Sequence, residues 1–266
     1  MPLARTAAGR AGLAALRDAP DRAVVALDYD GTLSPVVARP QDAVPAAGAV
    51  DALRALAARV RRVALVTGRP ADVVVALGGL SGVPGLVVLG QYGLQRWEAG
   101  TFTSPEPLPG IAELRTALPA LVGPEGADVE DKGLALVVHT RRAPDPPGAW
   151  ERLIPPLTAL AAQVGLEAHP GRLVVELRPP GFDKRGALRS LCTPAPSAVV
   201  FAGDDVGDLP AFDAVEELRR DGVPGLLVAS ASAEGPAELR ERADVVVDGP
   251  AGVVALLGRL LDPTRS

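Results

Sequence analysis

The sequence contains a single cysteine, Cys192, which excludes a disulfide within the chain and a zinc site built from cysteines. Lysine is almost absent and arginine carries most of the positive charge, so Lys132 and Lys184 stand out. The net charge of −5 argues against nucleic-acid binding, because affinity for phosphate backbones comes from clustered Lys and Arg. No apolar run approaches the roughly 20 residues of a membrane span, so no membrane association is expected.

The remaining composition is typical of a globular enzyme. Apolar residues make up 48% of the 266 residues and charged residues 22%, and this length suits one large domain or a domain with an insert. Residues 1–20 have no acidic side chain before Asp18, but they also lack the apolar core of a secretion signal. We interpret them as a short amphipathic helix and expect a cytoplasmic, monomeric protein.

Strand and helix patterns alternate in the two outer parts of the chain, 1–103 and 180–266. Short apolar runs typical of buried strands alternate with segments that carry apolar residues at helical spacing. The strand-like runs are 22–28, 61–68, 85–90, 197–203, 224–230 and 243–248, and the helix-like segments are 46–60, 70–77, 183–191, 208–220, 235–242 and 250–261. This order predicts an α/β core with a Rossmann-like, doubly wound parallel sheet.

The middle of the chain, 104–179, has a different order. A helix and two strands are followed by a second helix and two further strands, which predicts an inserted α+β cap with an antiparallel sheet backed by two helices. Hairpin turns are expected at 131–133 and at 169–171. Pro155 and Pro156 are expected to break or kink the second helix. Pro- and Gly-rich segments at both edges of the insert are candidate hinges.

Polar residues follow several of the predicted parallel strands, at the sheet edge where α/β proteins bind ligands. Each alone has an ordinary explanation as a helix cap, a turn or a solvated charge. Their shared edge favours a single site. The residues are Asp28, Asp30, Thr67, Gly68, Arg69, Lys184, Asp204, Asp205 and Asp208.

Five carboxylates at one edge require a cation, and oxygen ligands with room for water suit Mg²⁺. The hydroxyl of Thr67 and backbone N–H groups near Gly68 can donate to a phosphate, and Lys184 adds a compact positive charge. A carboxylate held in such a site can attack phosphorus to form an aspartyl phosphate. A second aspartate two residues on can act first as acid and then as base.

The segment Asp28-Tyr29-Asp30-Gly31-Thr32 resembles the D-x-D-G-T motif of the haloacid dehalogenase superfamily of phosphotransferases. The resemblance implies that Asp28 is the nucleophile and a metal ligand. It makes Asp30 the general acid and base, with its backbone carbonyl on the metal. By the same resemblance Thr67 binds phosphate, Lys184 steadies the nucleophile, Asp204 ligates the metal, and Asp205 and Asp208 support the site.

The cap sequences "VEDKGLALVVHTR" (129–141) and "VVELRPPGFDKRGAL" (174–188) look like those of the trehalose-6-phosphate phosphatases. This resemblance covers the chain from about residue 20 onward. It implies that trehalose 6-phosphate is the substrate, with a functional link to a trehalose-6-phosphate synthase. It also implies that Glu130, Lys132, Arg141 and Glu176 bind the sugar, with Thr67, Gly68 and Arg69 on the substrate's phosphate side.

Other interpretations stay open. Lys132 at a hairpin tip also fits a solvated lysine, Glu176 and Arg178 fit a surface pair, and His139 fits a supporting residue. Gly207 and Pro210 depart from the family's usual fourth motif, but the metal-side aspartates of that motif are present. The departures therefore put the detailed adjustment of the site in doubt more than the reaction itself. The alternative functions are a phosphatase of sucrose phosphate or glucosylglycerol phosphate, a phosphomutase, and a non-catalytic binding protein.

Overall fold

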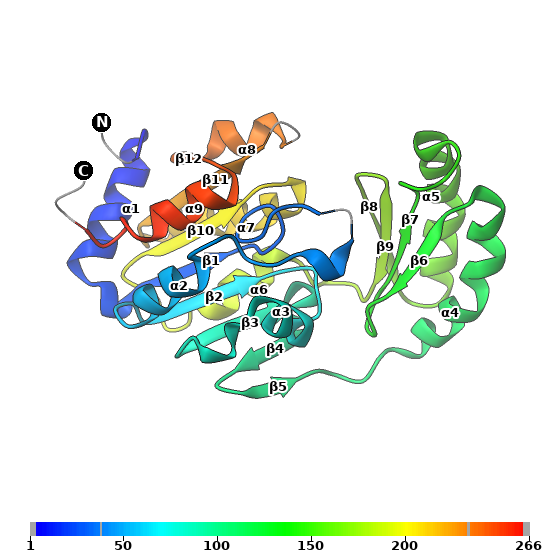
Figure 1. The fold of residues 1–266 in the computed structure, drawn as a ribbon, viewed down its shortest axis with the longest axis horizontal. Coiled ribbons are helices and arrows are strands. Elements are labelled where there is room, and N and C mark those ends of the chain that lie inside the picture. The colour runs from blue at the N-terminus through cyan, green and yellow to red at the C-terminus, as the bar shows by residue number, and fades with distance from the viewer. Residues whose placement is uncertain (1–3, 38, 233–234, 263–266) are drawn as a thin grey trace. The chain divides into compact units, whose positions relative to one another are not determined.

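The structure, a computed structural model, describes residues 4–37, 39–232 and 235–262, and it divides the chain into two units (Figure 1). The core unit comprises the chain up to Ser104 and from Asp183 onward, and the cap unit comprises Pro105–Phe182. Among the described residues, no helix has both the length and the apolar character needed to cross a membrane.

The core unit is built on an eight-stranded sheet in the order β12-β11-β10-β1-β2-β3-β4-β5. The six strands from β12 to β3 in this order are parallel, which confirms the predicted doubly wound sheet. An antiparallel hairpin of β4 and β5, which the sequence pattern did not indicate, extends one edge. The bounds are β1 Val24–Leu27, β2 Arg62–Val66, β3 Leu86–Gly90, β4 Gln95–Glu98, β5 Thr101–Thr103, β10 Val199–Gly203, β11 Gly225–Ala231 and β12 Val245–Asp248.

Helices cover both faces of this sheet (Figure 1). Side chains alternate along β1, so Val25 and Leu27 join the apolar cluster with α1, α2, α3 and α9, whereas Val24 and Ala26 join the cluster with α6, α7 and α8. Strands buried on both faces explain the continuous apolar runs in the sequence. The bounds are α1 Ala7–Asp18, α2 Ala49–Ala57, α3 Ala71–Gly78, α6 Lys184–Leu191, α7 Leu209–Arg220, α8 Ala237–Arg242 and α9 Gly249–Leu257.

The helix predicted near the N-terminus is present as α1, and it packs closely against β11. Thr6 caps it by accepting a hydrogen bond from the backbone N–H of Gly9 at 2.9 Å. A Cβ atom added at Gly12 would lie 2.0 Å from the carbonyl oxygen of Gly225. Glycine at this position therefore sets how near the helix approaches the sheet.

The cap unit contains a four-stranded antiparallel sheet in the order β6-β7-β9-β8. Two helices pack on one face of it, where Leu136, Val138, Val175 and Leu177 are buried against their apolar side chains. This arrangement confirms the predicted α+β cap. The bounds are α4 Pro109–Val122, β6 Asp128–Asp131, β7 Leu136–His139, α5 Pro146–Gln163, β8 Glu167–Gly171 and β9 Val174–Arg178.

The predicted position of the second hairpin turn in the cap is wrong, and the predicted break in its second helix is absent. The second hairpin turns at Arg172 and Leu173 rather than at 169–171, because Gly171 pairs directly with Val174 and leaves only two residues in the loop. Helix α5 continues through Pro155 and Pro156 without a break. Its buried stripe, which includes Leu153, Leu157 and Ala161, packs in the cap core and holds the helix together despite the missing N–H groups.

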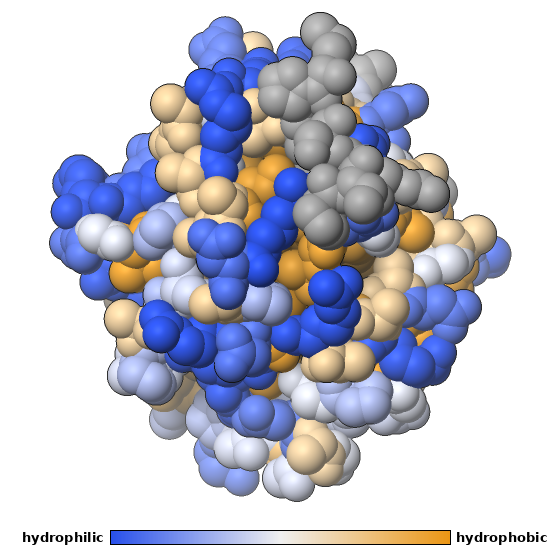
Figure 2. Space-filling model, turned by 90° about the vertical axis from the view of Figure 1, so that its left-hand side faces the viewer, coloured by the Kyte–Doolittle hydropathy of each residue, from blue (hydrophilic) through white to orange (hydrophobic). Residues whose placement is uncertain are grey.

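Figure 2 shows one face of the molecule. Hydrophilic side chains dominate this face, and smaller apolar areas lie between them. Apolar atoms are a normal part of a soluble protein's surface, because polar groups are too few to cover it. We therefore attach no function to the apolar areas on this face.

Candidate active site

The carboxyl ends of three neighbouring parallel strands meet at one edge of the core sheet. Strand β1 lies between β10 and β2, and the chain continues from β1 to β2 on one side and reaches β10 on the other. Such a switch in strand order opens the crevice in which doubly wound proteins bind ligands. Asp28 follows β1, Thr67 follows β2, and Asp204 follows β10, so these three predicted residues lie at the same edge.

Lys184 is buried between two aspartates at this edge. Its Nζ lies 2.7 Å from Oδ1 of Asp28 and 2.7 Å from Oδ1 of Asp208. Lys184 and Asp28 are each 5% exposed, and Asp208 is fully buried. Lys184 is the first residue of α6, and the side chain of Asp183 caps that helix by accepting from the N–H of Gly186. The cap fixes the start of the helix and therefore the position of the ammonium group.

Asp208 also organises the loop that follows β10. Its Oδ2 accepts hydrogen bonds from the backbone N–H groups of Asp204 at 2.9 Å and Asp205 at 3.2 Å. The side chain of Asp205 accepts in turn from the N–H of Gly207 at 2.8 Å. Asp205 and Asp208 also form a reciprocal capping box, in which each side chain accepts from the other residue's backbone N–H. Asp208 thus joins the loop of Asp204 to Lys184, whereas Asp205 is exposed at its surface.

Three carboxylates form a compact cluster. One oxygen each of Asp28, Asp204 and Asp208 lies within 4.8 Å of the others. Thr32 donates a hydrogen bond to Oδ1 of Asp204 at 3.2 Å. Gly31 has a φ of +74°, and a Cβ atom there would lie 1.9 Å from Oδ2 of Asp204, so only glycine fits between the two loops. The side chain of Asp30, whose backbone carbonyl the family resemblance placed on the metal, lies outside this cluster.

Burial and mutual repulsion shape the charges in this cluster. Burial raises the pKa of Asp28 well above its usual range, against the opposing effect of Lys184. Burial and the carboxylates of Asp208 and Asp205 raise the pKa of Asp204 to about 8. Burial alone would lower the pKa of Lys184, but Asp208 and Asp28 raise it well above its usual range. The carboxylate oxygens of this cluster therefore favour binding either protons or a second cation in addition to Lys184. A hard divalent metal ion is such a cation.

Arg69 points its guanidinium group at Asp30. Its Nε donates to Oδ2 of Asp30 at 2.6 Å and its Nη2 donates to Oδ1 at 2.8 Å. The backbone N–H of Arg69 donates to the hydroxyl oxygen of Thr67 at 3.1 Å. Gly68 lies so close to Tyr92 that an added Cβ would be 2.7 Å from its phenolic oxygen. The structure thus brings Arg69 to Asp30, a pairing that the sequence did not indicate.

A polar face of the cap sheet, opposite its helices, carries most of the predicted sugar-binding residues. Strand register places Glu130, Val137, Glu176 and His169 side by side in one row across the four strands. Lys132 donates to Oε1 of Glu176 at 2.8 Å, and both side chains are largely buried. The interpretation of Lys132 as merely solvated is therefore wrong.

His139, like His169, lies on the polar face of the cap sheet. Its Nε2 lies 2.8 Å from Oε2 of Glu130. Arg141, to which the family resemblance gave a role in sugar binding, lies in the exposed turn after β7 and not in the strand. The pattern of alternating side chains ends at His139, so it does not place Arg141 on the same face.

Two residues of this face lay outside the predicted site. Nδ1 of His169 lies 3.3 Å from Nη2 of Arg178. Arg178 and Glu176 are each only 6% exposed, so the surface-pair interpretation is wrong. Burial lowers the pKa of His169, and the neighbouring Arg178 lowers it further. The displaced hairpin turn hid His169, because the sequence pattern put it in the turn instead of the strand.

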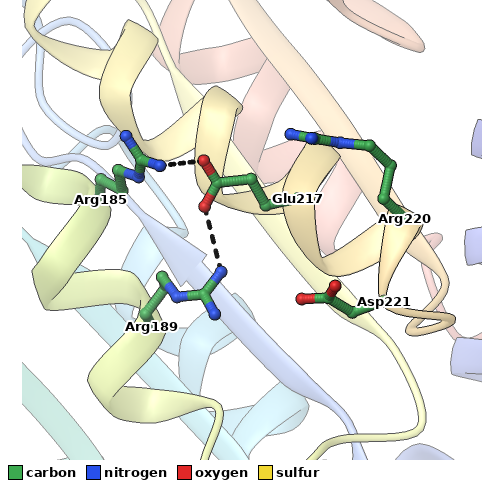
Figure 3. Close-up of a pocket in the computed structure, with 5 residues that line it drawn as sticks. All are labelled: Arg185, Arg189, Glu217, Arg220 and Asp221. Atoms are coloured by element: carbon green, nitrogen blue, oxygen red, sulfur yellow. Dashed lines mark hydrogen bonds and ion pairs between the residues drawn. The ribbon is translucent and has the colours of Figure 1, made fainter.

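A separate hollow of about 400 Å³ lies where α6 and α7 run side by side, lined by Arg185, Arg189, Glu217, Arg220 and Asp221 (Figure 3). Both Arg185 and Arg189 donate to the Glu217 carboxylate (Figure 3). None of the residues that line it belongs to the carboxylate cluster. Arginines already paired with a carboxylate are poorly suited to bind a further anion, so we place no site here.

Comparison with known proteins identifies the family. A family model described as trehalose-phosphatase matches residues 26–243. The chain belongs to the trehalose-phosphatase family. A trehalose-phosphate phosphatase of Mycobacterium marinum is 35% identical over 212 residues, which cover 73% of this chain and 52% of that protein. An uncharacterised glycosyl hydrolase of Mycobacterium tuberculosis is 38% identical over 209 residues, which cover 73% of this chain and 15% of that protein.

Family membership confirms the resemblance seen in the motifs. The fold agrees with it, since the C-terminal domain of the trehalose-6-phosphate phosphatase of C. albicans superposes with a TM-score of 0.78 at 20% identity, over 98% of each chain. The chain spans about half the length, or less, of the first curated relatives that it matches.

Proposed function

We propose that this chain hydrolyses trehalose 6-phosphate to trehalose and phosphate through an aspartyl-phosphate intermediate. The observation that carries the proposal is the buried Lys184, 2.7 Å from both Asp28 and Asp208 and next to Asp204 at the switch point of the sheet. Family membership and the mycobacterial relative named a trehalose-phosphate phosphatase support the choice of substrate.

In the first step, an oxygen of Asp28 attacks the phosphorus atom, and the bond between phosphorus and the sugar oxygen breaks. Asp30 delivers its proton to that oxygen, and trehalose leaves. In the second step, Asp30 takes a proton from water, whose oxygen attacks the same phosphorus. The bond to Asp28 breaks, so phosphate and the free carboxylate are restored. Lys184 holds the free carboxylate of Asp28 in place through their ion pair.

The carboxylates of Asp28 and Asp204 and the carbonyl of Asp30 are the groups that would hold Mg²⁺. When bound, Mg²⁺ would neutralise charge on the transferred phosphoryl group. Asp208 has both oxygens occupied by Lys184 and backbone N–H groups, so we assign it to support rather than to the metal. The hydroxyl of Thr67 and the N–H of Gly68 are proposed to bind the phosphate.

We assign the cap's polar face to the sugar. Glu130, Lys132 and Glu176 present charged donors and acceptors from a rigid sheet, and a disaccharide offers hydroxyl groups that such side chains discriminate well. Arg141, in its exposed turn, is the least supported member of the predicted set. The cytoplasmic location, the monomeric state and the link to a synthase stay predictions, and light scattering of the purified protein tests the second.

The decisive experiment measures released phosphate from a panel of sugar phosphates and p-nitrophenyl phosphate, with and without Mg²⁺. We expect kcat/KM for trehalose 6-phosphate to exceed that for sucrose, glucosylglycerol and glucose phosphates by at least about tenfold. Asp28→Asn should lower kcat by at least about 10³-fold. Lys132→Met should lower kcat/KM for trehalose 6-phosphate and spare p-nitrophenyl phosphate.

Each rival predicts a different outcome of the same panel. Another sugar phosphate that outperforms trehalose 6-phosphate would reassign the substrate. A need for an added bisphosphate, with transfer instead of phosphate release, would indicate a mutase. Thermal stabilisation by trehalose 6-phosphate without turnover would indicate a binding protein. An Asp28→Asn variant with near-normal kcat would refute the mechanism.

A further inference from the structure

We propose that Arg69 is a positioning residue that holds the carboxyl of Asp30 for proton transfer, and not a ligand of the substrate's phosphate. The inference rests on the proposed function of this site, because it concerns the acid that serves the leaving sugar. It starts from the two-pronged contact in which Nε and Nη2 of Arg69 donate to the two oxygens of Asp30 at 2.6 and 2.8 Å.

The guanidinium group is itself held in place. Its third nitrogen, Nη1, donates to the carbonyl oxygen of Pro40 at 2.8 Å, and its central carbon lies 5.9 Å from the centroid of the Tyr29 ring. Tyr29 is fully buried, and its hydroxyl donates to the carbonyl of Ala43 at 2.7 Å. All three nitrogens of the guanidinium group are hydrogen-bonded, and the group also lies near the fixed ring of Tyr29. Its position is therefore restricted, and so is the position of the Asp30 carboxylate that it binds.

The backbone of Arg69 is fixed as well. Its carbonyl accepts from the N–H of Gln91 at 2.9 Å, and the carbonyl of Thr67 accepts from the N–H of Tyr92 at 3.0 Å. Gln91 and Tyr92 both adopt left-handed backbone conformations, with φ of 44° and 60°. Two adjacent non-glycine residues in that region cost about 1–3 kcal/mol each. The fold tolerates this strain at the turn that holds the loop of Arg69.

The direction of the arginine decides between the two roles. Both of its well-aligned donors, Nε and Nη2, face the carboxylate of Asp30, and the side chain of Arg69 is only 15% exposed. The parallel pair of donors that suits two oxygens of one anion is therefore engaged by Asp30, as a positioning role requires. Asp30, which is 36% exposed at its side chain, presents its open side to solvent while the arginine holds the other.

The test compares two kinds of leaving group. A sugar oxygen leaves only if it receives a proton, whereas p-nitrophenolate leaves without one. Because Asp30 also activates water in the second step for both substrates, the comparison uses release of the leaving group in a single turnover. We expect Arg69→Gln to lower that rate for trehalose 6-phosphate by about 10–100-fold and for p-nitrophenyl phosphate by less than about threefold, with KM nearly unchanged for both. Arg69→Lys should recover only part of the loss, because an ammonium group cannot bind a carboxylate with two parallel bonds.

Arg39→Gln is the matched control, because Arg39 also pairs with an aspartate, Asp42 at 2.6 Å, but is 71% exposed. We expect it to change neither rate. A variant pair tests the coupling: Arg69→Gln combined with Asp30→Asn should be no slower than Asp30→Asn alone. Additive losses, equal losses on both substrates, or a loss expressed in KM would overturn the proposal.

The outcomes also separate this proposal from the proposed function. If trehalose 6-phosphate proves a poor substrate, the ratio of rates can be measured with glucose 6-phosphate, which also needs a proton on its leaving oxygen. A melting temperature within about 2 °C of the wild type shows that Arg69→Gln is folded. If that variant unfolds instead, Arg69→Lys must show the unequal losses, and equal losses there refute the proposal.

Discussion

We predict that Asp204 makes the stability of this protein depend on pH and on cation binding. Burial and the neighbouring carboxylates of Asp208 and Asp205 raise its pKa from 3.8 to about 8. Because the folded-state pKa is raised, the protonated carboxyl stabilises the metal-free fold fully below about pH 4, and this stabilisation is lost as the pH rises to about 8. At pH 8 the folded protein therefore carries a buried charge that it tolerates poorly unless a cation is bound.

The substitution Asp204→Asn removes this charge and keeps the shape. A pKa that rises from 3.8 to about 8 corresponds to about 6 kcal/mol. A buried amide costs about 1–3 kcal/mol of its own, although it can still accept the hydrogen bond from Thr32. We therefore expect the metal-free variant at pH 8 to be about 3–5 kcal/mol more stable than the wild type, which raises the melting temperature by about 6–20 °C.

The assay is thermal unfolding at pH 5 and pH 8, with EDTA and with Mg²⁺. Mg²⁺ should stabilise the wild type at pH 8 by about 2.7 kcal/mol at a hundredfold excess over its Kd, and should leave Asp204→Asn nearly unchanged. Asp221→Asn is the control, because it removes an exposed carboxylate of the core unit that lies outside the cluster; it should change neither unfolding curve. Equal stability of Asp204→Asn and wild type in EDTA at pH 8 would refute this reasoning.

Two further predictions concern packing and burial. Gly12→Ala should destabilise the core by about 2–3 kcal/mol, because the new Cβ would lie 2.0 Å from the carbonyl oxygen of Gly225. Gly186→Ala lies in the exposed first turn of α6, and no atom would be nearer than 3.5 Å to its new Cβ, so it should stabilise the protein by about 0.5–1 kcal/mol. Urea unfolding measures both changes, and changes in the free energy of unfolding with the same sign for both variants would contradict this packing. Burial raises the pKa of Cys192 to about 11, so a thiol reagent at pH 8 should react slowly until the protein unfolds. Equal rates in the native and unfolded protein would be inconsistent with that burial.

The core and the aspartates at its edge could be predicted from the sequence for a simple reason. Parallel strands place their carboxyl ends at one edge, so residues that follow β1, β2 and β10 meet whatever the details of packing. Asp28, Thr67 and Asp204 therefore followed from chain order alone. The hairpin of β4 and β5 did not, because its strands are short and its outer strand is exposed.

The cap shows where such prediction ends. The order of its helices and strands could be predicted from the sequence. The row that joins Glu130, Glu176 and His169 could not, because it depends on register across four strands. A shift of one residue would send every side chain to the opposite face. The turn at Arg172 and Leu173, two residues later than expected, is what places His169 in a strand.

The sequence by itself determined the alternating core, the inserted cap and the acidic edge, because apolar periodicity and strand order are local properties of the chain. Only the tertiary structure decided which charges pair. Lys184 could have met any of five carboxylates, and it lies between Asp28 and Asp208. Arg69 lies two residues after Thr67, which was predicted to bind phosphate, yet its guanidinium group donates two hydrogen bonds to Asp30. Such pairings depend on where side chains from distant segments end in space, to within about an ångström, and no local pattern encodes that distance.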